Sequence, residues 1–214
     1  MGDIMATKVQ KKELIRKQIF EAANIYSQKL AGKKFLYVTP NYYFEILFLT
    51  DKFLHLTGVN TKLTAKDFYE KARKGTLQNN QFYFDKEHPF DIAKNKLPNL
   101  IQLPELTTKQ IYIINNMKTL TLVYRYGLTN FNFTLGLTEY IDKKNNIIKE
   151  TFIPRTLRSN DNAPKYNTDE LNCNVSFIFE KDASKRIYTT LLVKEYGASI
   201  PLNIKHLIDS SFYK

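Results

Sequence analysis

At 214 residues the chain is long enough to bury a substantial core, either as one large domain or as one domain with an appendage. Its 43% hydrophobic and 14% aromatic residues exclude a disordered chain. Lys and Arg outnumber Asp and Glu by 32 to 21, which favours a polyanionic partner. RNA or DNA is favoured over a membrane, because no basic segment has the apolar face of an interfacial helix. The alternative is that the positive charge only reflects an AT-rich genome, which favours Lys, Asn, Ile and Tyr.

Signals for export, membrane insertion and metal binding are missing from the sequence. The single cysteine, Cys173, can form neither an internal disulfide nor a cysteine-based zinc site. No apolar run near the N-terminus marks a signal peptide, and the longest apolar stretch, residues 42–49, is too short to span a bilayer. No two histidines are neighbours in sequence, and no acidic cluster has ligand spacing. We therefore expect a cytoplasmic protein without a cofactor or metal ion.

Residues 8–30 have the pattern of an amphipathic helix. Apolar residues recur at steps of three and four, and Gly32 supplies a stop signal. We place this helix in a segment of its own, residues 1–33, before a main domain of residues 34–214. The helix either recruits a partner or packs into the core of the main domain, and the sequence leaves both open. Its apolar stripe consists of Ile15, Ile19, Ala22, Tyr26 and Leu30.

A hairpin and two short helices follow. Residues 35–39 and 42–49 are rich in aromatic and branched side chains around a Pro-Asn turn, which predicts paired strands. Asp51 is expected to cap a short helix that carries His55 and ends at Gly58. Thr64, with Asp67 three residues later, predicts a capped helix over residues 65–74.

The second half of the chain changes to a period of two. After one or two short helices within residues 77–106, strands are predicted at 111–115, 119–126, 131–141, 147–153, 175–180 and 186–195. The links at 115–118, 127–130, 142–146 and 181–184 are short and polar, which favours antiparallel neighbours. The sequence therefore predicts an α+β fold with an N-terminal helix and hairpin, short helices, and an antiparallel β-meander of about five to six strands.

Alternation within the strands separates two faces of the predicted sheet. One face is apolar and should be buried. The other face should carry Thr134, Arg125 and Gly136, and the missing side chain of Gly136 would let a ligand approach the backbone. An ordinary solvated sheet face is the alternative. The residues expected on the buried face are Leu120, Leu122, Tyr124, Phe131, Phe133, Leu135 and Leu137.

A few residues have the chemistry for cleaving RNA without a metal, which needs a base, an acid and cations near the phosphate. His55 suits either proton role because the pKa of histidine is ~6.5, although its apolar neighbours also fit a core histidine. Arg125 offers a fork of donors for phosphate. Arg155, Thr156 and Arg158 begin a polar segment that is either a phosphate site or a plain basic loop. The other two histidines, His88 and His206, are predicted to be structural or on the surface.

Residues 53–77 carry a recognisable motif. Phe53-Leu-His-Leu-Thr-Gly58 is followed by the Asp67-Phe-Tyr-Glu-Lys71 helix and then by Gly75-Thr-Leu77. This segment resembles the phage-associated branch of the barnase/EndoU/colicin/RelE superfamily. The resemblance implies an α+β fold, an RNA-binding concave sheet face and metal-independent ribonuclease activity. It also implies that His55 is the catalytic histidine, with Thr57 and Gly58 shaping its turn.

The complete candidate site joins this histidine to residues chosen without the resemblance. The catalytic set is His55, Arg125 and Thr156, and the substrate-binding set is Thr57, Lys62, Thr134, Arg155 and Arg158. Related nucleases act as toxins or counter-defence proteins, including anti-CRISPR proteins that damage a guide RNA. The resemblance thus implies an RNA endonuclease of phage or mobile-element origin acting on tRNA, mRNA or guide RNA. The alternative is a non-enzymatic inhibitor that binds a protein–RNA complex through the same basic face.

Overall fold

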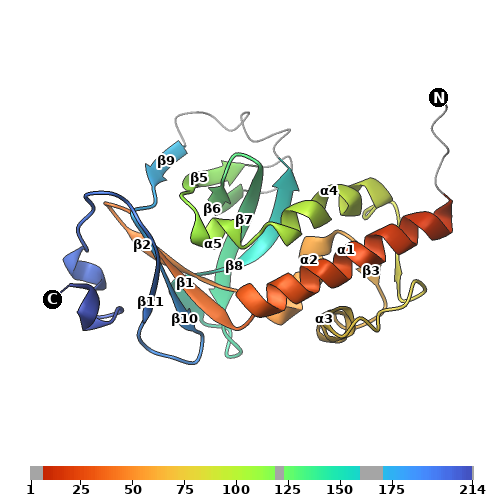
Figure 1. Ribbon diagram of the computed structural model, residues 1–214, viewed down its shortest axis with the longest axis horizontal. Coiled ribbons are helices and arrows are strands. Elements are labelled where there is room, and N and C mark those ends of the chain that lie inside the picture. The colour runs from red at the N-terminus through yellow and green to blue at the C-terminus, as the bar shows by residue number, and fades with distance from the viewer. Residues whose placement is uncertain (1–6, 119–122, 160–170, 214) are drawn as a thin grey trace.

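The computed structural model describes residues 7–118, 123–159 and 171–213, and confirms the predicted α+β class (Figure 1). None of the helices in these ranges is long and apolar enough to cross a membrane. The helices are α1 (Lys8–Lys29), α2 (Phe53–Thr57), α3 (Ala65–Arg73), α4 (Phe90–Ile101) and α5 (Glu105–Thr108), with 3-10 turns η1 (Thr50–Lys52), η4 (Leu202–Ile204) and η5 (Ser210–Phe212). The strands are β1 (Lys33–Val38), β2 (Tyr43–Leu47), β3 (Asn60–Thr61), β4 (Phe82–Tyr83), β5 (Tyr112–Lys118), β6 (Val123–Thr129), β7 (Phe133–Ile141), β8 (Ile147–Ser159), β9 (Leu171–Asn174), β10 (Phe177–Asp182) and β11 (Thr190–Lys194).

The first helix is packed into the main core. Thr7 and Gln10 form a reciprocal capping box at its start, which satisfies two backbone donors. Figure 1 shows α1 running beside α4, and it also contacts α3. Its predicted stripe is completely buried in the same hydrophobic cluster as the inner faces of β1, β2, β6 and β7. The stripe is therefore covered by the protein's own core.

One large sheet organises the molecule. Within the described residues its strand order is β11-β10-β1-β2-β8-β7-β6-β5-β9, and β3 and β4 form a separate pair. The predicted hairpin and meander are confirmed as antiparallel pairs. The two halves are joined by a pair that the turn pattern did not predict, since β2 and β8 run parallel over Glu45–Thr151 and Ile46–Phe152.

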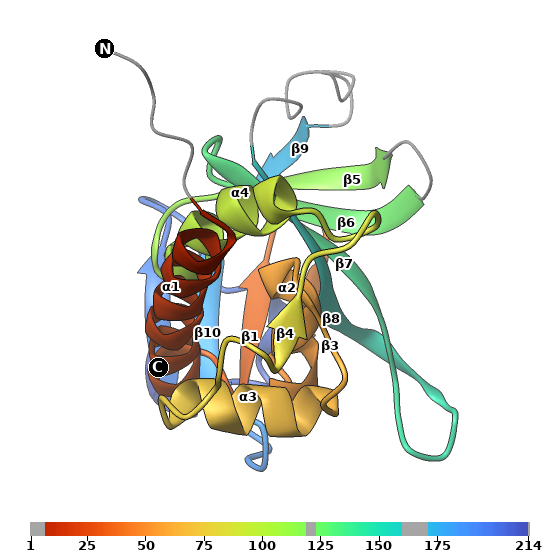
Figure 2. The same ribbon diagram turned by 90° about the vertical axis from the view of Figure 1, so that its right-hand side faces the viewer.

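Each face of the sheet has its own cover. The helices lie on one side of the sheet, as the turned view in Figure 2 shows for α1, α3 and α4 in front of the strands, and α4 contacts β8. On the other face of β1 and β10, the C-terminal segment provides Tyr188, Ile204 and Ile208. These three side chains pack on Leu36, Val38, Phe177 and Phe179.

The predicted buried face is confirmed where the structure describes it, with one correction. Phe133, Leu135 and Leu137 are completely buried. Leu120 and Leu122 lie outside the described residues. Phe131 was wrongly assigned to this face, because it sits in the turn before β7 at φ 67° and is 54% exposed. The Asn130 side chain accepts from the Phe133 N–H and fixes that turn.

Several predicted boundaries are also wrong. Residues 115–118 and 127–129, expected as turns, belong to β5 and β6, because residues 115–118 pair with 123–126 and residues 127–129 pair with 112–114 across the ladder. Strand β8 continues to Ser159, so Arg155, Thr156 and Arg158 lie on a strand and not in a loop. Asp51 lies within the 3-10 turn before α2, and the N-cap of α2 is Lys52 without a side-chain bond. Long-range pairing overrides local polarity in the first two cases.

The division at residue 33 stays a prediction, and the packing of α1 provides its test. A protein that begins at Lys33 would expose the apolar residues that α1 covers, so we expect it to aggregate or to lose its cooperative unfolding transition in urea. Val9→Ser, at an exposed position of the same helix, is the control and should unfold like the wild type. A soluble truncated protein with an unchanged transition would show that α1 is an independent appendage.

Candidate active site

Three elements meet where the parallel pair ends. Beyond Phe152, strand β8 no longer pairs with β2, and α2 and α4 contact it instead. Asn99 Nδ2 donates to Ser159 Oγ at 2.9 Å, and this hydroxyl donates to the Asn95 carbonyl at 3.2 Å. Helix α4 is thereby fastened to the end of β8.

The motif glycine allows α2 to approach α4. Gly58 has φ 76°, a left-handed conformation that ends α2 and is costly for other residues. A Cβ atom built at this position would lie 2.9 Å from Ile92 Cγ2 and 3.1 Å from Lys96 Cδ. Thr57 is completely buried, and its hydroxyl donates to the Leu54 carbonyl at 2.6 Å. Thr57 and Gly58 therefore shape the turn that follows His55.

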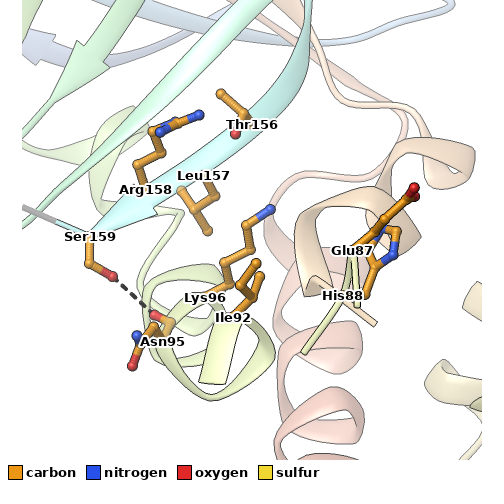
Figure 3. Close-up of a pocket in the computed structure, with 9 residues that line it drawn as sticks. All are labelled: Glu87, His88, Ile92, Asn95, Lys96, Thr156, Leu157, Arg158 and Ser159. Carbon is orange, nitrogen blue, oxygen red and sulfur yellow. Dashed lines mark hydrogen bonds between the residues drawn. The ribbon is translucent and has the colours of Figure 1, made fainter. Parts of the chain in front are cut away.

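A cleft of about 360 Å³ lies between α4 and β8. Figure 3 shows the Lys96 side chain projecting from α4, with Arg158 and Leu157 on one side and Glu87 and His88 on the other. Among the described residues, the cleft is lined by Glu87, His88, Ile92, Asn95, Lys96, Thr156, Leu157, Arg158 and Ser159.

The cleft holds two cations, Lys96 and Arg158, that form no ion pair with any described residue. Burial, followed by the charge of Arg158, lowers the pKa of Lys96 from 10.5 to about 8. Arg158 is half-buried, and its buried Nε atom has no hydrogen-bond partner among the described residues. In the part of the chain that the structure describes, no carboxylate forms an ion pair with either residue. An anion that binds here would interact with two partly desolvated cations, and this attraction is stronger than in water.

His55 lies beside this cleft with its side chain exposed, while Phe53 and Leu56 of the same helix face the core. The interpretation as a sealed core histidine is therefore wrong. Partial burial of the ring lowers the pKa of His55 to about 4, and the charges of Lys96, Arg155, His88 and Lys52 act in the same direction. At neutral pH the imidazole is unprotonated, which is the form that accepts a proton.

The structure brings three more predicted residues to the same region. Thr156 and Arg158 line the cleft. Arg155 is exposed at the β-bulge where β8 shifts register against β7, between Gly136 and Leu137. Its charge reaches His55, as the pKa of that histidine shows.

Other predicted residues lie elsewhere. Arg125 is an exposed side chain that lines a second depression with Arg155, and it lies 3.8 Å from Glu139 and 4.0 Å from Glu150. Lys62 is exposed between β3 and α3. Thr134 is only 1% exposed, and its hydroxyl finds no hydrogen-bond partner in the described ranges. The structure does not place these three residues in the cleft lining.

The sheet-face glycine does not open a path to the backbone, so this prediction is wrong. A Cβ atom at Gly136 would lie 2.7 Å from Thr156 Cγ2, 3.4 Å from Met117 Sδ and 3.5 Å from Tyr124 Cδ2. Neighbouring side chains fill the space above it. Gly136 thus allows close packing across β5, β6 and β8.

Two cleft residues were missed by the sequence prediction. Lys96 lies next to the buried stripe of α4, which consists of Ala93, Leu97 and Leu100. A lysine beside an apolar stripe is visible in the sequence and could have indicated a partly buried charge. His88 was predicted to be structural or on the surface, without a role in the site, and it lines the cleft with its Nδ1 3.3 Å from Asp85 Oδ1. Only the folded turn reveals that pair, because both residues lie in an irregular segment.

Comparison with known proteins identifies the family. The family described as phage-Barnase-EndoU-ColicinE5/D-RelE like nuclease4 matches residues 18–196, so the chain belongs to this nuclease family. No curated protein and no solved structure matches the chain. Within residues 7–118, 123–159 and 171–213, no three His, Cys, Asp or Glu side chains gather into a group that could hold a metal ion.

Lys96→Met should stabilise the fold while weakening anion binding. The native lysine is charged at pH 7 in a place that disfavours the charge, so the variant should gain about 1–2 kcal/mol in its free energy of unfolding, measured in urea. The pKa of Lys96 is about 8 in the folded state and 10.5 in the unfolded state, so the wild type should gain stability as the pH rises from about 8 to 10.5. The difference in free energy of unfolding between Lys96→Met and the wild type should shrink over the same pH range. Lys94→Met, at an exposed position of α4, is the control. Equal stability of Lys96→Met and the wild type would contradict the unpaired charge.

Proposed function

We propose that this member of the nuclease family cleaves RNA without a metal ion, by attack of a 2′-hydroxyl on the adjacent phosphate. The observation that carries the proposal is the arrangement around the cleft. The unprotonated His55 lies beside Lys96 and Arg158, two partly buried cations for which the described residues provide no ion-pair partner. A nuclease site needs this combination of a proton acceptor and fixed positive charge.

In this proposal His55 takes the proton from the 2′-hydroxyl. Arg158 and Lys96 bind the phosphate and stabilise the charge that develops as the 2′-oxygen attacks, and Arg155 approaches the same phosphate from the bulge. The Thr156 hydroxyl is a further donor for a phosphate oxygen. The product is a 2′,3′-cyclic phosphate and a free 5′-hydroxyl. Bound phosphate also favours protonated His55, which aids proton transfer from the substrate.

Residues outside the cleft receive binding roles. Arg125 and Lys62 are exposed cations, and we assign them to RNA phosphates that flank the reacting one. Arg125 already has two acidic neighbours, which argues for binding and against a catalytic role. The burial of Thr57 and Thr134 favours roles in shaping the site over direct contact with substrate.

The biological setting that fits best is a counter-defence protein or toxin of phage or mobile-element origin, acting in the cytoplasm. The family is phage-associated, and the net charge of +11 suits an RNA target, either free or within a ribonucleoprotein complex. The candidate substrates are tRNA, mRNA and the guide RNA of a CRISPR effector, the last of which would make the protein an anti-CRISPR.

His55→Ala should abolish RNA cleavage and leave the fold intact, because the side chain is exposed and its helix is anchored by other residues. Pure protein is incubated with labelled RNA in EDTA, and products are resolved on a gel that separates cyclic from linear phosphate ends. The expected loss is about 10²–10⁴-fold in rate, as for the removal of a general base. His206→Ala, an exposed histidine in the C-terminal segment, is the matched control.

The outcomes of this assay separate the proposal from its alternatives. Cleavage that requires magnesium or that survives His55→Ala would contradict the mechanism. Tight RNA or ribonucleoprotein binding with no cleavage by the wild type would favour the non-enzymatic inhibitor, which needs the cations but not His55.

RNA affinity should fall steeply with salt, because cations release bound counterions when they meet phosphates. Each phosphate contact contributes about 0.7–0.9 to the slope of log affinity against log salt. Arg158→Ala, made in the inactive His55→Ala background, should therefore lower the slope by roughly one contact in fluorescence anisotropy titrations at several salt concentrations. Lys194→Ala, on the edge strand β11, is the control. A slope that is unchanged by Arg158→Ala would place the RNA elsewhere.

A further inference from the structure

A second histidine is held at the cleft by a carboxylate. His88 Nδ1 lies 3.3 Å from Asp85 Oδ1, and the same oxygen accepts from the backbone N–H of Glu87 at 3.0 Å and of His88 at 2.7 Å. The Asp85 N–H in turn donates to the His88 carbonyl at 3.2 Å. These bonds lower the pKa of Asp85, with the bond from Asn60 contributing most, so its carboxyl stays ionised. The turn fixes the ring of His88 and leaves Nε2 as its available nitrogen.

The turn that carries His88 is tied to the helix that carries His55. Asn60 follows Gly58 closely in the chain, and its Nδ2 donates to Asp85 Oδ2 at 2.8 Å. The small β3–β4 sheet pairs Asn60 with Tyr83, just before the turn. The electrostatic influence of His88 also contributes to the lowered pKa of His55. The two imidazoles are thus held near each other by direct structural links.

We propose that His88 is the general acid of the cleavage reaction and that Asp85 is its positioning residue, an inference that rests on the proposed function. His55 removes the proton from the 2′-oxygen, which forms a bond to phosphorus. The bond between phosphorus and the 5′-oxygen breaks, and His88 Nε2–H transfers its proton to that oxygen. The balance is one proton gained by His55 and one lost by His88, with water restoring both afterwards.

Lys96 is the competing candidate for the acid, since it lines the same cleft. It has no hydrogen-bond partner within the described residues that would orient its ammonium, and its neighbour Arg158 suits a shared phosphate site. His88, in contrast, is oriented by a carboxylate that is itself fixed by three further hydrogen bonds. A held proton donor is the arrangement that general acid catalysis requires.

The test compares two substrates that differ in the leaving group. The leaving group of RNA is a 5′-alkoxide, which needs a proton. The leaving group of a nucleoside 3′-(4-nitrophenyl phosphate) is a stable phenolate, which does not. His88→Ala should slow RNA cleavage about 10²–10⁴-fold but slow the aryl ester less than about 10-fold. His55→Ala should slow both substrates, because both need the base. Asp85→Asn should show a milder form of the His88→Ala pattern.

His88→Asn guards against a folding artefact, because its amide can keep the bond to Asp85 while lacking Nε2. It should behave like His88→Ala, with circular dichroism unchanged from the wild type. Equal slowing of both substrates, or no slowing of RNA cleavage, would overturn the role of His88 while leaving the ribonuclease proposal in place. Selective slowing of RNA in Lys96→Met and not in His88→Ala would assign the acid to Lys96. Failure of the wild type to cleave either substrate would overturn the proposed function together with this inference.

Discussion

A largely buried carboxylate at the centre of the sheet, 14% exposed, holds the two halves of the molecule together. Glu45 accepts from Lys34 Nζ at 2.6 Å, from Thr151 Oγ1 at 3.0 Å and from the Tyr188 hydroxyl at 2.8 Å, and Lys181 lies 3.6 Å away. Burial alone would raise the pKa of Glu45, but these partners, led by Lys34, outweigh burial and lower it. Loss of one partner from such a buried group costs about 3–5 kcal/mol. The cluster joins β1, β2, β8, β10 and the C-terminal segment.

This junction also determines where the cleft forms. The Glu45–Thr151 pair belongs to the short parallel contact, and β8 separates from β2 directly after it. The freed edge of β8 would expose backbone groups, and α2 and α4 cover it. The cover is incomplete, and the gap contains Lys96 and Arg158. Strand β8 therefore carries both a stabilised junction and a cleft whose charges are unfavourable for folding. Functional sites often contain such unfavourable groups, held in place by a stable surrounding structure.

Local signals were sufficient for much of the fold and for part of the site. The stripe of α1, the Thr64 cap and the left-handed Gly58 follow from short-range chemistry and were predictable. The position of Arg158 on a strand could not be predicted, because it depends on pairing with Thr134 of β7 and not on local sequence. For the same reason the cover over Gly136 was invisible in sequence. The motif identified His55, whereas Lys96 and His88 depend on how α4 and its preceding turn meet β8.

The cleft is assembled from distant parts of the chain. One wall comes from residues 87–96 and the other from residues 156–159, and β8 is held by a hydrogen bond between positions that are 106 residues apart. Contacts of such high sequence separation form late and slowly in folding. On a ribosome, the first 150 residues can build α1 to α5 and the hairpin but not the second wall. The nascent chain therefore stays without a complete cleft until residues 156–159 have been synthesised, which delays nuclease activity relative to the synthesis of α1 to α5.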